Sequence, residues 1–116
     1  MSTRQSLLRA WGRFQGAYPL VLAPIYTDMP FEVGTDLQDG RVAETVTGMR
    51  MAMAVNALGL PAIAVPVGVS GGLPHAVQVV GPRYREDLCL DAAEPIEERL
   101  RTVIHLDAQW PEWGRT

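Results

Sequence analysis

Residues 51–82 read MAMAVNALGLPAIAVPVGVSGGLPHAVQVVGP, a long apolar stretch without Asp, Glu, Lys or Arg. Its only titratable side chain is His75. Such a stretch is either a buried core or a membrane span, and a spanning helix needs about 20 uninterrupted apolar residues. Pro61 and Pro66 interrupt this one, and proline inside a helix removes a hydrogen bond and clashes with the preceding turn. We therefore interpret the stretch as a buried core.

The breaks in this stretch divide it into a helix end and two strands. Gly59 suits the position after a helix, because glycine adopts the left-handed conformation without steric cost. Residues 62–67 are apolar on both faces, as in a strand covered by helices. Residues 70–72, Ser-Gly-Gly, are typical of a turn, and residues 76–80 form a second strand. The two strands are predicted to pair as a β-hairpin.

The chain before the apolar stretch is predicted to begin with a capped helix and a strand. Ser2 can cap the helix, with Gln5 at the return position of a capping box. One face of this helix would carry its large apolar side chains, Leu7, Trp11 and Phe14. Residues 18–24 form the first strand, again apolar on both faces.

A long loop, residues 25–40, follows the first strand, and loops of this length are often functional. It carries four acidic residues, Asp28, Glu32, Asp36 and Asp39. Two carboxylates can share acid–base work only where the fold brings them together. We interpret these four as solvated loop acids.

Residues 41–58 are predicted to form a second helix. Its apolar residues repeat at helical spacing and would make one buried stripe, Val42, Val46, Met49 and Met53. The methionines at 49, 51 and 53 fit core packing better than a soft metal site. Strand, helix and strand over residues 18–67 then make a βαβ unit, which would be parallel and right-handed.

The C-terminal part is predicted to be a third helix, residues 86–94, followed by a kink or a new helix at Pro95. From Thr102 onward we expect an irregular arm. The predicted fold is α/β: a small mixed sheet, made of the βαβ unit plus the hairpin, covered by helices. The chain is one domain at most, with residues 1–101 as the folded segment and 102–116 as the arm.

Several motifs together resemble the C-terminal part of the amidase signature enzymes. They are NALGLPA at 56–62, VPVG at 65–68, and GLP at 72–74 followed by VQVVG at 77–81. The similarity extends to RYREDLCLDAAE at 83–94 and back to YPLVLAP at 18–24, so that it covers about residues 7–100. The chain departs from the family at Ala76, where glycine is usual, and at Pro95, inside the expected closing helix.

The resemblance implies hydrolysis of carboxamides, which are non-peptide C–N bonds, by a Ser nucleophile, a bridging cis-Ser and a Lys. The bridge passes the proton to the Lys, and backbone amides stabilise the oxyanion. The Gly/Ser-rich signature that carries these groups is absent, and all ten basic residues are Arg. No catalytic residue is therefore carried over to this chain. The 25–40 loop would lie near the mouth of the substrate pocket, with Phe31 and Asp36 as predicted substrate-binding residues.

Other candidate nucleophiles have simpler explanations. Residues 68–72 match the G-x-S-x-G pattern around Ser70, with His75 nearby, but the nucleophile elbow needs a strand followed by a helix. Here a second strand follows. Cys89 on a buried helical stripe reads as a small apolar residue rather than a thiolate. His75 and His105 lack the spacing of metal ligands, so we expect no metal site and no cofactor.

The composition limits the partners and the compartment. The net charge of −3 argues against a nucleic-acid partner. A single cysteine cannot form an internal disulfide, and we expect no signal peptide, which makes the cytoplasm the expected compartment. We expect no membrane partner.

Three hypotheses of function remain. The first is a portion of an amidase that is completed by a polypeptide supplying Ser, cis-Ser and Lys, and that meets a small amide substrate only in the completed enzyme. The second is a non-catalytic interaction module that pairs with a second copy or another partner through its sheet edge. The third is an independent esterase that uses Ser70 and His75.

Overall fold

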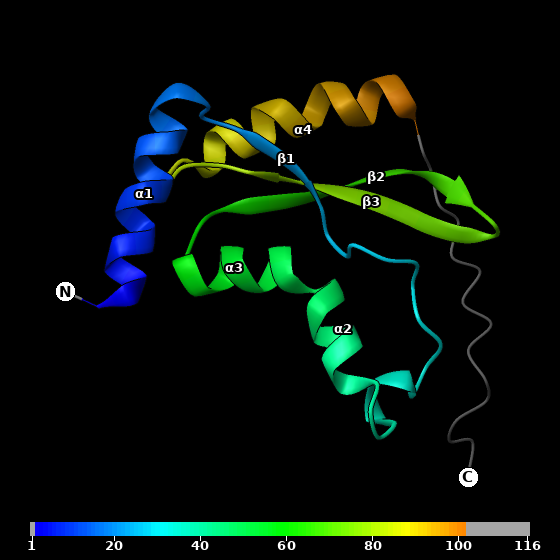
Figure 1. Ribbon diagram of the computed structural model, residues 1–116. Coiled ribbons are helices and arrows are strands. Elements are labelled where there is room, and N and C mark those ends of the chain that lie inside the picture. The colour runs from blue at the N-terminus through cyan, green and yellow to red at the C-terminus, as the bar shows by residue number, and fades with distance from the viewer. Residues whose placement is uncertain (1, 102–116) are drawn as a thin grey trace, which may run out of the picture.

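The computed structural model describes residues 2–101 as helices packed on both sides of a three-stranded sheet (Figure 1). The elements in chain order are α1 (Thr3–Ala17), β1 (Val21–Pro24), the 3-10 helix η1 (Thr35–Leu37), α2 (Val42–Gly48), α3 (Arg50–Leu58), β2 (Ala62–Ser70), β3 (Leu73–Val80) and α4 (Glu86–Leu100). The predicted α/β class is confirmed. The predicted arm, residues 102–116, lies outside the described residues, so the domain boundary stays a prediction.

Helix α1 begins at the predicted cap. The Ser2 side chain accepts a hydrogen bond from the Gln5 backbone N–H at 3.4 Å, and Gln5 Oε1 accepts one from the Ser2 N–H at 3.1 Å. This reciprocal pair satisfies two backbone donors that the first turn of a helix leaves unpaired. Arg4 Nε also donates to the Ala57 carbonyl oxygen at 2.7 Å, which fastens α1 to the end of α3.

Strands β2 and β3 form the predicted hairpin. Gly71 and Gly72 connect them with positive φ angles of 58° and 77°. Two successive left-handed residues are what a two-residue type I′ turn requires, and glycine adopts this conformation without strain. Ser70 pairs with Leu73 directly beside the turn, so both strands are longer than predicted.

The sheet order corrects one predicted detail. Its order is β1-β3-β2, and both neighbouring pairs are antiparallel. Strands β1 and β2 therefore run in the same direction, but β3 is inserted between them and they share no hydrogen bonds. The predicted mixed sheet with a parallel βαβ pair was wrong in this respect. The sequence pattern of the strands fits both orders, with β1 next to β2 or with β3 between them. A strand that is apolar on both faces can occupy any place in a sheet covered by helices.

Helix α4 covers one face of the hairpin. Val65 and Val79 from the two strands pack against Ala93 and make the buried core, with Ile63 and Ile96 at its margin. This contact positions α4 along the hairpin (Figure 1).

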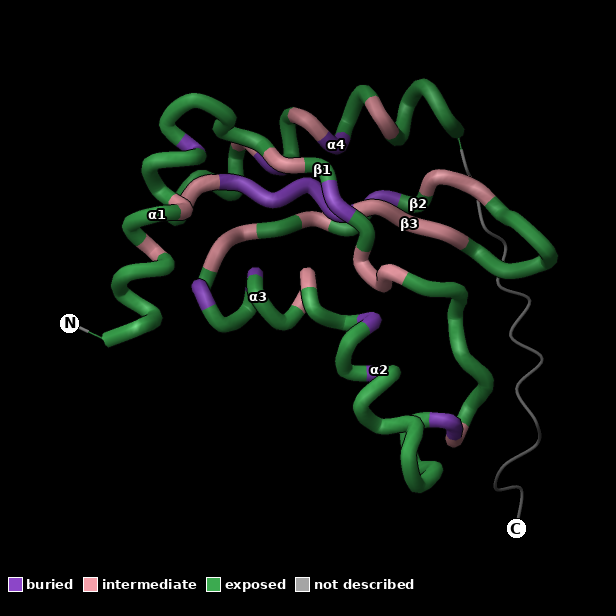
Figure 2. The backbone as a smooth tube through the Cα atoms, in the orientation of Figure 1, coloured by how far each residue is buried: buried purple, intermediate pink, exposed green. Residues whose placement is uncertain are grey.

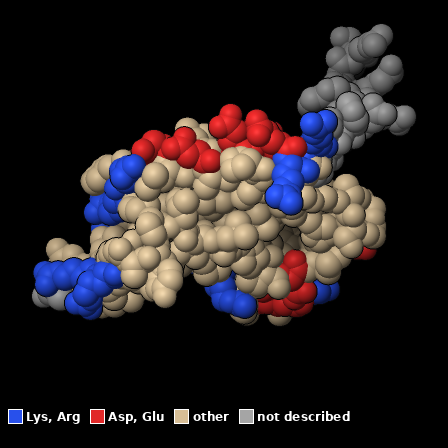
Figure 3. Space-filling model, turned by 90° about the horizontal axis from the view of Figure 1, so that it is seen from above, with Lys and Arg blue, Asp and Glu red and all other residues tan. Residues whose placement is uncertain are grey.

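Pro95 does not start a new helix, because α4 is continuous from Glu86 to Leu100. Proline removes the hydrogen bond to the carbonyl four residues earlier, that of Asp91. Asp91 and Pro95 are both exposed, so water can satisfy that carbonyl while the inward side of the helix keeps its packing. The outer face of α4 is acidic (Figure 3). Its exposed acids are Glu86, Asp87, Asp91, Glu94, Glu97 and Glu98.

The predicted second helix is bent at Met49, so that α2 and α3 point in different directions (Figure 1). The Gly48 carbonyl accepts hydrogen bonds from the Thr27 N–H at 2.9 Å and from Thr27 Oγ1 at 3.3 Å. Side-chain and loop donors at a helical carbonyl are an established cause of helix bending. The loop after β1 therefore sets the angle between the two helices.

The stripe predicted to be buried on this helix is exposed instead. Val42, Val46, Met49 and Met53 are each between 42% and 52% exposed. The buried positions lie on other sides of the two helices, at Thr45, Gly48, Val55 and Leu58. Periodicity identifies an apolar face correctly, but within residues 2–101 about half of each of these side chains stays exposed; Figure 2 shows α2 and α3 largely in the exposed colour.

None of the helices within residues 2–101 is both long and apolar enough to cross a membrane.

Candidate functional site

A hollow of about 230 Å³ lies between the loop after β1 and helix α2. Its wall residues are Tyr26, Asp28, Met29, Pro30, Phe31, Thr35, Arg41, Glu44 and Thr45. The loop reaches α2 because Thr27 bonds to Gly48, and Thr35 N–H bonds to the Glu32 carbonyl oxygen at 3.0 Å. The first bond joins the loop to α2, and the second forms a turn within the loop.

The aromatic side of the hollow is a tilted pair of rings. The ring centroids of Tyr26 and Phe31 lie 5.6 Å apart, with an angle of 59° between the planes. Tyr26 also packs directly on Gly48, where a Cβ atom would overlap its ring. Glycine at position 48 thus makes room for the ring that forms this wall. Tilted aromatic pairs of this spacing are a favourable arrangement that can also accept a flat apolar ligand group.

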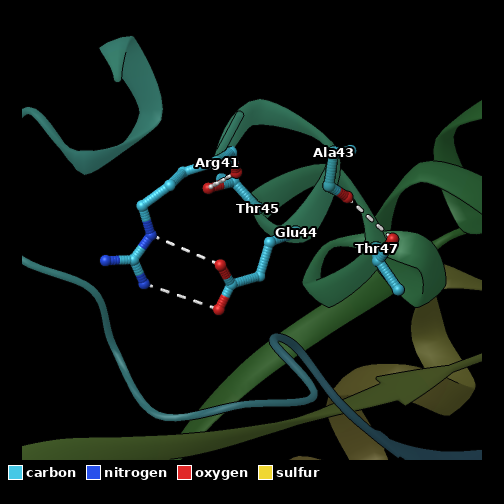
Figure 4. A network of polar contacts seen from close by, with 5 residues as sticks. All are labelled: Arg41, Ala43, Glu44, Thr45 and Thr47. Atoms are coloured by element: carbon cyan, nitrogen blue, oxygen red, sulfur yellow. Dashed lines mark hydrogen bonds and ion pairs between the residues drawn. The ribbon is translucent and has the colours of Figure 1, made fainter. Parts of the chain in front are cut away.

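The polar side of the hollow is an ion pair at the start of α2 (Figure 4). Arg41 Nε donates to Glu44 Oε2 at 3.3 Å, and Arg41 Nη2 donates to Glu44 Oε1 at 3.5 Å. Thr45 Oγ1 donates to the Arg41 carbonyl oxygen at 3.2 Å. About half of each charged side chain is exposed, so the pair contributes little to stability, roughly 0–1 kcal/mol. The hollow is therefore lined by the two charged groups as well as by the two rings.

The structure places the two predicted substrate-binding residues differently. Phe31 lies in the wall of the hollow, whereas Asp36 lies in η1 and is not among the wall residues. Of the other loop acids, Asp28 lines the hollow and Glu32 and Asp39 do not. Within residues 2–101 no three of the His, Cys, Asp and Glu side chains come together as a metal site would need. Substrate binding by Phe31 and Asp36 stays a prediction.

Sequence reasoning misses most of this wall. Tyr26, Arg41 and Glu44 are not among the predicted residues, although they line the hollow. The i, i+3 spacing of opposite charges at 41 and 44 is a signal for an ion pair on a helix. No local pattern would have found Tyr26, because its position depends on contact with Gly48, 22 positions further along the chain.

Neither Ser70 nor Cys89 has the surroundings of a catalytic nucleophile. Ser70 is the last residue of β2 at an exposed hairpin turn, as predicted, and no hydrogen bond joins it to His75 in the described residues. The Nε2 atom of His75 is buried without a hydrogen-bond partner. Cys89 is 2% exposed and burial raises the pKa of its thiol, which disfavours the reactive thiolate. Its Sγ donates to the Pro61 carbonyl oxygen at 3.7 Å.

The sequence and the fold correspond to one class of protein. The family model named Amidase matches residues 1–90. The chain belongs to the amidase family.

Two relatives show how the chain compares with larger members. The indoleacetamide hydrolase of Bradyrhizobium japonicum is 42% identical over 106 residues, which are 90% of this chain and 23% of that protein. A glutamyl-tRNA(Gln) amidotransferase subunit from Streptococcus equi subsp. zooepidemicus is 38% identical over 80 residues, 69% of this chain and 16% of the relative.

One solved structure extends the comparison to three dimensions. The crystal structure of the corresponding glutamyl-tRNA(Gln) amidotransferase subunit from Thermotoga maritima superposes with a TM-score of 0.72 at 28% identity. The match covers 82% of this chain and 20% of that structure. The chain therefore spans about a fifth of the length of the relatives that it matches. The resemblance to a portion of an amidase is confirmed.

Proposed function

We propose that this chain is the C-terminal portion of a carboxamide hydrolase, completed by a polypeptide that carries the catalytic Ser, cis-Ser and Lys. The observation that carries this proposal is its 42% identity with an indoleacetamide hydrolase over only 23% of that protein. The absence of any Lys supports the same conclusion, since this chain cannot complete a Ser/cis-Ser/Lys set. Its own contribution is strands, covering helices and part of the substrate pocket.

The hollow supplies what this portion can give to such a pocket. The rings of Tyr26 and Phe31 offer a flat apolar surface, and Arg41 and Glu44 offer polar groups at the rim. Together these suit a carboxamide joined to an aromatic group, because the ring would stack while the rim binds the polar end. The name of the Bradyrhizobium relative points to the same substrate class. The catalytic portion would perform the acyl transfer itself.

A chimera tests this proposal directly. The matched segment of the Bradyrhizobium japonicum relative is replaced by the present chain, and release of ammonia from indole-3-acetamide is measured. We expect a folded and active enzyme. A chimera with native circular dichroism that hydrolyses neither indole-3-acetamide nor other primary amides would contradict the proposal.

Variants in the chimera test the wall of the hollow. Phe31→Ala is expected to raise KM about tenfold with little change in kcat, because stacking binds the substrate and its transition state equally. Asp36→Asn tests the second predicted residue by the same comparison. Leu37→Ala is the matched control, since Leu37 lies in the same segment, is 83% exposed and is not a wall residue. An unchanged KM for Phe31→Ala would show that the hollow does not bind the substrate.

The alternative is a non-catalytic module that pairs through its sheet. The observation in its favour is that β1 and β2 are both edges of the described sheet, each with one unpaired side. Pro66 in the middle of β2 works against it, because proline on an edge strand blocks pairing with another strand. Light scattering after size-exclusion chromatography decides between them: a stable dimer of the chain alone would favour the module. The cytoplasm is the compartment that we propose for either form.

A further inference from the structure

Helix α3 is apolar on two opposite sides. Val55 and Leu58 are buried, with exposures of 7% and 9%. Met49 and Met53, four positions apart at and after the bend, lie on the opposite side and are 42% and 49% exposed. Arg50 is the only charged residue in α3. A helix with apolar side chains on two opposite sides is expected to be covered on both of them.

The exposed side continues onto the neighbouring helix. On α2, Val42 and Val46 precede Met49 and Met53 at the same helical spacing and are similarly exposed, 52% and 44%. We call these four residues the α2–α3 stripe. Apolar residues exposed singly are ordinary on protein surfaces, but a row kept at helical spacing over two helices is typical of an interaction site.

The stripe adjoins the hollow. Arg41, Glu44 and Thr45, which form its polar wall, lie on the same helix as Val42 and Val46. Whatever covers Val42 and Val46 therefore contacts the helix that carries this polar wall. A charge-poor centre of this kind fits a stable interface better than a transient one, because charged residues are depleted at the centre of interfaces.

We propose that the α2–α3 stripe is the surface on which the catalytic portion of the amidase docks. This inference rests on the proposed function and adds to it the residues that join the two portions. The occupant is identified by two observations: about four-fifths of the length of the matched relatives lies outside this chain, and a catalytic Lys has to come from that part. Docking there brings the catalytic groups next to the substrate hollow.

Co-expression tests the docking surface. The tagged chain is produced together with the part of the Bradyrhizobium japonicum relative that lies outside the matched segment, and the captured amount is measured by quantitative mass spectrometry. Met53→Glu places a charge at the α3 end of the stripe and is expected to lower capture at least tenfold. Leu90→Glu is the matched control, because Leu90 is an apolar residue of α4, outside the stripe, and is at 59% at least as exposed as Met53 at 49%. Circular dichroism verifies that both variants fold.

Methionine oxidation gives a second readout that needs no variant. Hydrogen peroxide converts exposed methionine to its sulfoxide, which mass spectrometry locates. Met49 and Met53 are expected to oxidise readily in the chain alone and at least tenfold more slowly in the captured complex.

Each outcome decides the matter. Equal capture of wild type and Met53→Glu, or equal oxidation in the free and captured chain, overturns the docking surface. Failure of the wild-type chain to capture the catalytic part also overturns it. So does protection of Met53 from oxidation that increases with the concentration of the chain alone, because the occupant is then a second copy of the chain. An active chimera together with any of these results leaves the proposed function intact, whereas an inactive chimera removes the function itself.

Discussion

Gly81 is a position where a single added methyl group would overlap a buried side chain, the thiol of Cys89. A Cβ atom there would lie 2.6 Å from Cys89 Sγ and 3.3 Å from the Arg85 carbonyl oxygen, against 3.4–4 Å for ordinary contact. The sulfur cannot retreat easily, because Cys89 is 2% exposed and its Sγ already contacts the Pro61 carbonyl oxygen at 3.7 Å. Inserting atoms into a packed core costs about 1–3 kcal/mol, and we expect about 2 kcal/mol for Gly81→Ala.

Urea unfolding followed by circular dichroism measures this loss. With a slope of about 1–3 kcal/mol per molar urea, a loss of about 2 kcal/mol lowers the midpoint by roughly 1 M. Gly16→Ala is the matched control, since nothing lies within 4 Å of its added Cβ atom. That substitution should stabilise the chain by about 0.5–1 kcal/mol, because alanine favours a helix over glycine.

The double variant tests the physical cause. Cys89→Ala alone should cost about 1 kcal/mol, since it deletes one buried atom from a packed site. In combination with Gly81→Ala it removes the overlap, so the double variant should be more stable than the sum of the single losses by at least about 0.5 kcal/mol. Strictly additive losses, or a Gly81→Ala midpoint equal to that of wild type, would refute the reasoning.

Three further predictions concern the site, the sheet and the thiol. Gly48→Ala should force the Tyr26 ring out of the wall and lower the free energy of unfolding by about 1–3 kcal/mol, measured by thermal unfolding. Adding Tyr26→Ala to this variant should relieve part of that loss. A Gly48→Ala variant more stable than wild type would contradict the packing of Tyr26 on Gly48. Gln78→Leu leaves the Pro24 carbonyl oxygen without its 2.9 Å hydrogen bond, which should cost about 1–3 kcal/mol in urea unfolding, and an unchanged midpoint would mean that water replaces the bond. Burial raises the pKa of the Cys89 thiol, so its thiolate fraction at pH 8 is below that of an exposed thiol. Ellman's reagent should therefore label Cys89 only as the chain unfolds. Rapid labelling of the folded chain would contradict this burial.

Features that depend on neighbouring residues could be predicted from the sequence. The capping box at Ser2 and the glycine turn at 71 and 72 each use residues within a few positions, so the chemistry that forms them is visible in the sequence itself. The same holds for the hairpin placement of Ser70, which argues correctly against a nucleophile elbow.

Features that depend on distant contacts could not be predicted. β3 lies between β1 and β2. Other strand orders would fit the same apolar patterns, so the sequence does not distinguish between them. The bend at Met49 follows from the bond between Thr27 and Gly48, and the Tyr26 wall follows from the same approach of the loop to α2. The predicted burial of Met53 was wrong for a different reason: periodicity reports which face is apolar, not which molecule covers it.

The sheet order also has a consequence for how the chain folds. β2 and β3 meet across a two-residue turn, whereas the Gln78 side chain on β3 reaches the Pro24 carbonyl on β1 from 54 positions away. Hairpins close in about 1–10 μs, and the entropy of closing a long loop must be overcome before β1 can add. The hairpin and α4, contiguous over residues 62–100, are therefore expected to assemble first, with β1 joining last at an already formed strand. A shortened chain that lacks α1 and β1 would keep this early unit and lose only the step that completes the sheet.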